Sequence, residues 1–295
     1  MLAFGLGNLA PGDAATIIAG RLSDVPPSTE QIAALRHALH LDESLPVRYA
    51  WWLGNAVRGD LGHSYRTGKP VLTELLTHFP ATLHIACLGF IIAVVIALPL
   101  GIVAAVNRGS WVDRMVRLTT LFGASLPNYW LGYLLIIIFA LGLGWLPVAG
   151  RERTNAAVLP AVTLALGTVA TLTRLMRSSL LETLNADFIR TARAKGLRER
   201  TIVVRHALKG SLLPVITILG ITFGHMLGGA VVVEQIFAWS GIGKLLIDSI
   251  YDRDYPVIQG FVMFMGMVFT IINLLVDIAY PLLDPQIGST GRQTN

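Results

Sequence analysis

Charged residues are scarce in this chain. Asp, Glu, Lys and Arg make up 14% of its 295 residues, against 54% hydrophobic residues. Soluble domains carry about 25% charged residues, and the mean hydropathy here is high at +0.63. This composition excludes an ordinary soluble domain. It predicts an all-α protein that crosses a membrane several times.

Cysteine and catalytic motifs are also nearly absent. The single Cys87 lies inside an apolar run, where a small buried residue is its ordinary role. One cysteine excludes an internal disulfide and a cysteine-based metal site. The patterns HExxH and GxSxG do not occur, and no paired carboxylates lie within the apolar runs. These absences argue against an integral membrane enzyme.

Long apolar runs alternate with polar loops. Five runs are long enough to cross a hydrocarbon core about 30 Å thick, and they lie at about 82–106, 118–143, 156–173, 212–233 and 256–283. Pro127 is expected to bend the second run. Cytoplasmic loops collect Lys and Arg, and the alternation of basic and less basic loops predicts residues 11–79 on the extracytoplasmic side and the tail at 285–295 in the cytoplasm. Within 11–79, a short helix is expected at 28–40, capped by Ser28.

The most basic loop lies between the third and fourth runs. Between positions 174 and 210 it holds nine Lys or Arg and three Asp or Glu, and its central part reads DFIRTARAKGLRERTIVVRHALKGSLLP. Glycine allows a sharp turn, so we predict two short helices hinged at Gly196, with Pro214 in the first turn of the next span. Helical periodicity gives each short helix one face: Phe188, Ala192 and Lys195 before the hinge, and Ile202, His206 and Lys209 after it.

Several sequence blocks resemble one family of membrane proteins. TARAKGL, HAL and LLP in the basic loop, with LAPGD, GDLGHS, EQIFAWSGIGKLL and DRDYP elsewhere, are similar to the dipeptide/oligopeptide/nickel branch of the binding-protein-dependent ABC transporter permeases. The general family signature begins Glu-Ala-Ala, with a glycine six residues after the glutamate. Here those positions hold Arg190, Thr191, Ala192 and Gly196, a departure that fits the peptide branch better than the sugar branch.

The resemblance implies the fold and the role. An ABC importer type-1 transmembrane domain is expected over 80–284, with five full spans plus a partial first span at 1–10, in the bacterial cytoplasmic (inner) membrane. The chain would be a permease subunit for di- or oligopeptides or a similar small solute. The expected partners are a second homologous permease subunit, one or two ATP-binding subunits, an extracytoplasmic solute-binding protein and the lipid bilayer, and no nucleic acid. ATP and Mg would bind to the partner subunits, and no cofactor to this chain.

The resemblance also assigns three groups of candidate residues. In the family the cytoplasmic loop docks into a cleft on the ATPase subunit, which makes residues 182–211 the coupling loop. Its candidate residues are Asp187, Arg190, Thr191, Ala192, Arg193, Lys195, Gly196 and His206. The pore-lining candidates, on the glycine-rich fourth full span, are Gly220, Gly224, His225 and Gly228, although small residues there also suit helix packing. The segment expected to dip toward the outer pore mouth contains Glu234, Phe237, Gly241 and Gly243.

The N-terminal stretch leaves two interpretations open. Residues 1–10 supply only about half a membrane thickness of apolar helix. They form either a short re-entrant piece shielded by neighbouring spans, or the end of a span that begins about 15–25 residues before Met1, to judge from the length of a span. The second interpretation is favoured, because the family has a full span immediately before LAPGD.

Other classes of protein make different demands on the sequence. A secondary transporter working alone needs charged groups or broken helices at the midplane of repeated halves, and the sequence shows neither. GIGK at 241–244 lacks the spacing of a phosphate-binding loop. Ionisable groups within spans suggest function. For His84 we expect a structural role, and for Asp277 a structural hydrogen bond rather than proton transfer. The substrate itself is not readable from the sequence, nor is the choice between a homodimeric and a heterodimeric permease pair.

Overall fold

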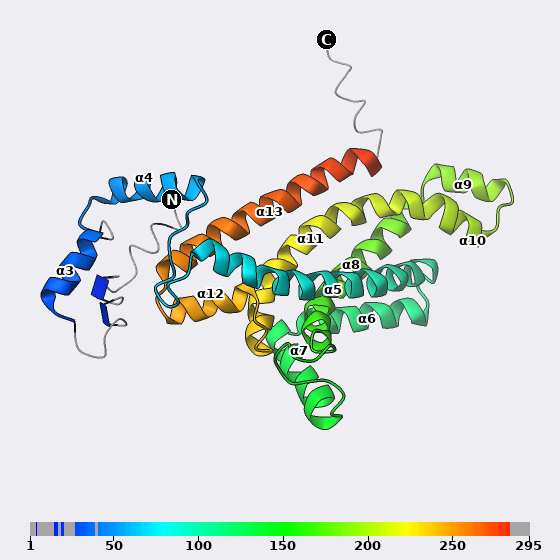
Figure 1. Cartoon of the computed structure of the whole chain (residues 1–295). Coiled ribbons are helices and arrows are strands. Elements are labelled where there is room, and N and C mark those ends of the chain that lie inside the picture. Colours follow the sequence, from blue (N-terminus) through cyan, green and yellow to red (C-terminus); the bar gives the residue numbers. More distant parts are fainter. Residues whose placement is uncertain (1–3, 5–14, 17–18, 21–26, 39–40, 284–295) are drawn as a thin grey trace, which may run out of the picture. The chain divides into compact units, whose positions relative to one another are not determined.

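The structure is a computed structural model of the chain (Figure 1). It describes residues 27–38 and 41–283, together with Phe4, Ala15, Thr16, Ala19 and Gly20. The predicted partial span at 1–10 lies outside the described residues except for Phe4, and so do LAPGD and the tail at 285–295. Where the chain is described, its regular elements are helices, and its β-structure is one isolated bridge between His63 and Pro70. The predicted all-α class is therefore confirmed.

The helices follow one another along the chain with short connections. They are α3 (Thr29–Ala38), α4 (Leu45–Val57), α5 (Val71–Val106), α6 (Trp111–Ser125), α7 (Asn128–Leu135), the π-helix η1 (Ile136–Gly142), α8 (Val158–Leu184), α9 (Asp187–Ala194), α10 (Glu199–Thr201), the π-helix η2 (Ile202–Ala207), α11 (Leu208–Ile236), α12 (Ile242–Tyr251) and α13 (Tyr255–Leu283). Residue contacts divide the chain into two compact units, 1–80 with 244–268 and 81–243 with 269–295.

Four helical stretches are long and apolar enough to span a membrane: 71–106, 158–184, 199–236 and 255–278. The stretches 111–125 and 128–142 pass the same test only as a pair and meet at an angle of 100°, so they form either a broken span or a re-entrant loop. Pro127 therefore does more than bend the predicted second span. Proline disfavours helical geometry in the residue before it, and Leu126 is accordingly extended, with ψ 129°.

The first unit contains a helix that begins as the sequence predicts. The Ser28 hydroxyl accepts a hydrogen bond from the Gln31 backbone N–H at 3.2 Å, and the Gln31 side chain accepts one from the Ser28 backbone N–H at 3.0 Å. This reciprocal pair is a capping box, which satisfies backbone donors that the first turn leaves unpaired. The predicted helix at 28–40 is confirmed as α3.

The second unit is built around α8, which packs against α6, α7 and α11 and is the most buried of the long stretches. Close helix approach depends on small residues here. A Cβ at Gly101 in α5 would lie 2.7 Å from Met176 Cβ and 2.8 Å from the Thr173 carbonyl oxygen, both in α8. Van der Waals fit of this kind drives helix association in lipid, so Gly101 serves packing, as expected for small residues in spans.

Pro214 lies inside α11, so the prediction that it opens the span is wrong. The helix begins earlier because α10, η2 and α11 form one helical run over 199–236. Proline lacks the N–H that would pair with the Gly210 carbonyl four residues earlier, and membrane helices tolerate such an internal proline. The Ser179 hydroxyl of α8 donates to the Ser211 carbonyl at 2.8 Å.

Candidate functional site

The basic loop at 182–211 turns at Gly196, as predicted. Gly196 has φ +76°, a left-handed conformation that favours glycine. Its N–H donates to the Arg193 carbonyl at 2.9 Å, and the Leu197 N–H donates to the Ala192 carbonyl at 3.4 Å. These two bonds form a Schellman motif. The motif ends α9 and sends the chain into α10.

The predicted face of α9 is divided between buried and exposed residues. Ile189 is 0% and Ala192 7% exposed, whereas Phe188 is 53% exposed and Lys195 is exposed as well. Ile189 and Ala192 join a cluster with Met176 of α8 and Val215 of α11, among others. Packing against α8 and α11 therefore buries Ile189, whereas its neighbour Phe188 stays exposed.

The predicted face after the hinge is divided in the same way. Ile202 is buried, but His206 and Lys209 are exposed. The segment is the π-helix η2, in which bonds run from residue i to i+5. Ile202 and Ala207, five residues apart, are both buried as a result.

Charge pairing within the loop joins its two helices across the hinge. Arg193 Nε donates to Glu199 Oε1 at 2.7 Å, and Arg193 Nη1 donates to the Leu184 carbonyl at 3.4 Å. The Glu199 hydrogen bond raises the pKa of Arg193 above its usual value. Arg193 is thus occupied within the loop.

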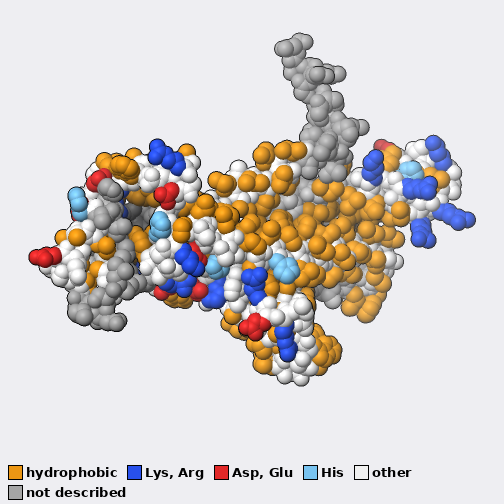
Figure 2. Space-filling view, viewed as in Figure 1, with side chains coloured by type: hydrophobic (Ala, Val, Ile, Leu, Met, Phe, Trp, Pro, Cys, Tyr) orange, Lys and Arg blue, Asp and Glu red, His pale blue; other side chains and the backbone are white. Residues whose placement is uncertain are grey.

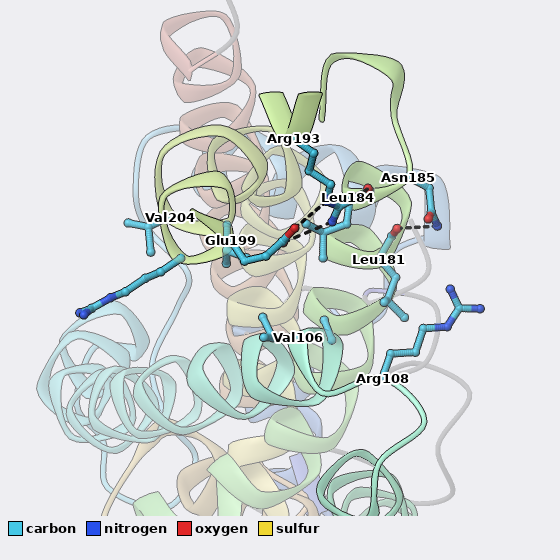
Figure 3. A pocket seen from close by; sticks show the side chains of 11 residues that line it. Val106, Arg108, Leu181, Leu184, Asn185, Arg193, Glu199 and Val204 are labelled. Atoms are coloured by element: carbon cyan, nitrogen blue, oxygen red, sulfur yellow. Dashed lines mark hydrogen bonds and ion pairs between the residues drawn. The ribbon is translucent and has the colours of Figure 1, made fainter. Parts of the chain in front are cut away.

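The remaining predicted residues of the loop, apart from buried Ala192, are exposed: Asp187, Arg190, Thr191, Lys195, Gly196 and His206. Figure 2 shows Lys and Arg side chains gathered where α9 and α10 extend from the helices. A cavity of about 580 Å³ lies beneath this surface, and Figure 3 shows Arg108, Arg193 and Glu199 among the residues that line it. The loop therefore presents a basic surface, with Phe188 as its exposed aromatic group.

The pore-lining candidates on α11 divide between two faces. A Cβ at Gly224 would lie 2.8 Å from the Phe269 ring, and one at Gly220 would overlap Val276. Both glycines therefore pack against α13. His225 and Gly228 are exposed instead, and a Cβ at Gly228 would have no neighbour within 4 Å.

The four candidates at 234–243 lie close together. Glu234 is fully buried, and its carboxylate accepts a hydrogen bond from the Thr82 hydroxyl at the start of the apolar part of α5. A Cβ at Gly241 would overlap that carboxylate, and one at Gly243 would lie 2.5 Å from Val231 Cα. Phe237 is 2% exposed and belongs to the adjacent apolar cluster. The two glycines thus make room for a buried acid.

Thr82 is the residue of this group that sequence reasoning missed. Its hydroxyl donates to Glu234 and also accepts a hydrogen bond from the Ile242 N–H at 2.9 Å. Trp239 adds a second link to the same turn of α5, donating from Nε1 to the Ala81 carbonyl at 2.9 Å. The segment at 237–242 is therefore fastened to α5 through both backbone and side chains. The signal available in the sequence was a lone threonine at the edge of an apolar run, which is common and unspecific.

The described part of the chain is a set of long apolar helices with a basic helical loop attached, which is the architecture of a multi-pass membrane protein. The family described as "Binding-protein-dependent transport system inner membrane component" matches residues 97–289. The chain belongs to this family. It is a multi-pass permease subunit of a bacterial ABC importer and lies in the bacterial inner membrane.

Relatives and solved structures agree with this assignment. The glutathione transport system permease protein GsiC of Escherichia coli (strain K12) is 39% identical over 287 residues, covering 97% of this chain and 92% of that protein. GsiC of Pectobacterium atrosepticum is 41% identical, and the alignment again covers 97% of this chain and 92% of that protein. A chain of the inward-facing MetNI methionine ABC transporter aligns with a TM-score of 0.61 at 21% identity, covering 71% of this chain and 95% of its own. A chain of an amino acid ABC transporter with histidines aligns with a TM-score of 0.55 at 16% identity, covering 70% and 93%. The solved structures show the fold alone.

Proposed function

We propose that this permease subunit carries di- or oligopeptides, or a similar small solute, and that its basic loop couples transport to ATP hydrolysis on partner subunits. The relatives named for glutathione, which is a tripeptide, support the substrate class. The construction of the loop at 182–211 supports the coupling. Its sharp hinge and basic surface fit a docking element for a soluble partner.

One observation carries the coupling proposal: α9 is fixed to two spans at once. Ile189 is fully buried in a cluster that includes Met176 of α8 and Val215 of α11. A partner that moves α9 therefore moves both spans with it, because packed interiors transmit displacement. ATP-driven closure of the partners would then bias the spans between two arrangements that open the path to alternate sides.

The proposal includes the partners and the sidedness. The loop at 182–211 and the tail at 285–295 lie in the cytoplasm, and residues 11–79 lie outside. A second homologous permease subunit completes the path, one or two ATP-binding subunits bind below, and a solute-binding protein docks above. ATP and Mg act on the ATP-binding subunits, and this chain binds no cofactor of its own. The charge alternation of the loops supports this arrangement.

A substitution at Phe188 tests the coupling. Phe188 is 53% exposed on α9, outside the apolar cluster that holds Ile189, so Phe188→Asp leaves the fold intact but puts a charge on the docking surface. We expect loss of co-purifying ATPase subunits and of solute-stimulated ATP turnover. The control Phe188→Leu keeps an apolar group and retains both. Normal ATPase retention and turnover in Phe188→Asp would refute the coupling role.

The substrate class is tested separately by native mass spectrometry of the solute-binding protein that co-purifies with the complex. Uptake of radiolabelled di- and tripeptides into proteoliposomes that contain the full assembly then gives the transport activity. We expect bound peptide and ATP-dependent uptake. A binding protein that carries a sugar or an inorganic ion, with no peptide uptake, would overturn the peptide assignment and leave the coupling proposal standing.

A further inference from the structure

A cavity of about 510 Å³ lies between two of the long apolar helices, α11 and α13. Its lining combines polar and apolar side chains: Thr217, Ile221, Asn273, Val276 and Asp277. Sites for small ligands commonly enclose about 300–1,000 Å³ and place a few polar groups on apolar walls. The cavity has both properties, and it lies apart from the basic loop and from the segment at 234–243.

Asp277 and Asn273 give the cavity its unusual character. They lie four residues apart and so share a face of α13. Within the part of the chain that the structure describes, neither side chain has a hydrogen bond or an ion pair. The structural hydrogen bond expected for Asp277 is therefore not found among the described residues. Asp277 lies in the last turn of the apolar stretch 255–278 and its side chain is exposed, so its carboxylate needs water or a polar ligand to satisfy it.

The face of α11 that lines the cavity continues beyond it along the helix. Thr217, Ile221, His225 and Gly228 follow each other at intervals of four, four and three residues, which places them along one side of the helix. His225 and Gly228 are exposed. Gly220 and Gly224 instead pack on Val276 and Phe269. The side of α11 that lines the cavity therefore also carries the exposed His225 and Gly228.

We propose that this cavity is a binding station on the translocation path, where Asp277 binds the positively charged amino group of the solute. A carboxylate only accepts hydrogen bonds, whereas the Asn273 amide both donates and accepts. Asn273 would thus hold the carbonyl or amide next to the solute's amino group, while Ile221 and Val276 contact its apolar part. The inference rests on the proposed function, because a peptide or similar amino-bearing solute supplies the ammonium group.

The test uses the chain's single cysteine. In the complete transporter carrying Cys87→Ala, Ile221→Cys places a thiol in the cavity beside Asp277. Its rate of modification by a cationic and by an anionic methanethiosulfonate reagent is then measured from the aqueous side. We expect the cationic reagent to modify the thiol faster than the anionic one. Adding Asp277→Asn should lower the ratio of the cationic to the anionic modification rate by about fivefold or more, which is the effect of a unit charge about 4 Å away in water.

The matched control is Gly228→Cys in the same background, on the same face but about 10 Å further along the helix. Salt screens charges over about 8–10 Å, so its rate ratio is expected to stay within about twofold when Asp277→Asn is added. Three results would overturn the proposal. In the first, the Ile221→Cys thiol reacts only with a membrane-permeant maleimide and not with the charged reagents. In the second, that thiol cross-links to the second permease subunit. In the third, the rate ratio does not change when Asp277→Asn is added.

A second arm reports on the solute itself. Trialanine with a free amino group is expected to slow modification of the Ile221→Cys thiol at least fivefold in transporting vesicles, and N-acetyl-trialanine is not. Equal protection by both peptides would overturn the ammonium site. If neither peptide is transported by the unsubstituted complex, the peptide assignment fails, and the reagent-ratio arm alone decides whether the acidic station exists.

Discussion

Arg177 in α8 donates two hydrogen bonds to the carboxylate of Asp113 in the first turn of α6, from Nε to Oδ1 at 2.7 Å and from Nη2 to Oδ2 at 2.8 Å. Asp113 is 1% exposed, and the Gly109 N–H donates to it at 3.0 Å. A bidentate pair fixes geometry as well as charge. It therefore sets the position of α6 against the central helix of its unit.

Loss of this buried pair should destabilise the protein strongly. Asp113→Ala removes two charge-assisted hydrogen bonds from Arg177, whose side chain is 21% exposed, and hydrogen bonds to charged groups contribute about 1.5–3 kcal/mol each. Arg117→Ala is the matched control, because its side chain is 54% exposed and 3.5 Å from the same carboxylate, where ion pairs contribute about 0–1 kcal/mol. Thermal unfolding in nanodiscs should show a large fall in Tm for the first variant only. Similar Tm values for the two variants would contradict the structural role.

Two neighbouring acids in the first unit are expected to behave differently. Asp254 is 1% exposed and accepts hydrogen bonds from the Ser64 hydroxyl at 2.5 Å and the Tyr65 and Arg66 N–H groups at 3.0 and 3.2 Å. Asp252 makes one ion pair with Arg66 at 3.4 Å, and its side chain is 36% exposed.

Asp254→Ala is therefore expected to open the turn at 63–69. The Ser64 hydroxyl is a buried donor, and leaving such a donor unsatisfied costs about 1–3 kcal/mol, whereas Asp252→Ala removes an exposed ion pair worth about 0–1 kcal/mol. Hydrogen exchange measured by mass spectrometry should show faster exchange across 63–69 in the first variant and little change in the second. Unchanged exchange in Asp254→Ala would show that the carboxylate does not hold this turn.

Features of the fold that depend on local sequence were predictable. Spans follow from runs of apolar residues, because lipid forces each run to satisfy its own backbone as a helix. The hinge at Gly196 was equally local, since a left-handed residue that ends a helix favours glycine. The position and chemistry of the basic loop therefore follow from the amino-acid sequence alone.

Features that depend on distant partners were not predictable. Periodicity grouped Phe188 with Ala192 and Lys195, but it gave no sign that Ile189 would be buried in a cluster with residues of α8 and α11. Thr82 and Glu234 lie far apart in sequence and meet only through the fold. Pro214 was predicted to start a helix, but α10, η2 and α11 form one helical run over 199–236 that already contains it. The first two failures concern which elements meet in space.

The two faces of α11 make opposite predictions for bulky residues. At Gly224 a Cβ would lie 2.8 Å from the Phe269 ring, so Gly224→Val should lower the yield of assembled complex by overpacking, which costs about 1–3 kcal/mol. A Cβ at Gly228 would meet nothing within 4 Å. Gly228→Val should therefore assemble normally and slow transport if it narrows the path. Size-exclusion yield and vesicle uptake separate the two effects, and normal assembly of Gly224→Val would argue against its packing on α13.

The hinge of the basic loop gives the sharpest test of coupling. Gly196 has φ +76° and open space where a Cβ would lie, so a substitution there acts through backbone strain rather than collision. The left-handed conformation costs an ordinary L-residue about 1–2 kcal/mol, which lowers the population of the hinged loop about 5- to 30-fold. Gly196→Val should therefore reduce transport and solute-stimulated ATP turnover together, with membrane insertion unchanged.

Gly196→Asn is the matched control, because asparagine visits the left-handed region far more readily than a β-branched residue. We expect it to retain most of the activity that Gly196→Val loses, although its side chain is polar and of similar size. Both variants place a Cβ at the same open position. A larger loss of activity in Gly196→Val than in Gly196→Asn would therefore reflect the backbone conformation of the hinge and not a steric collision. Equal loss in the two variants, or full activity in Gly196→Val, would show that the left-handed turn at Gly196 is not what joins α9 to the spans during transport.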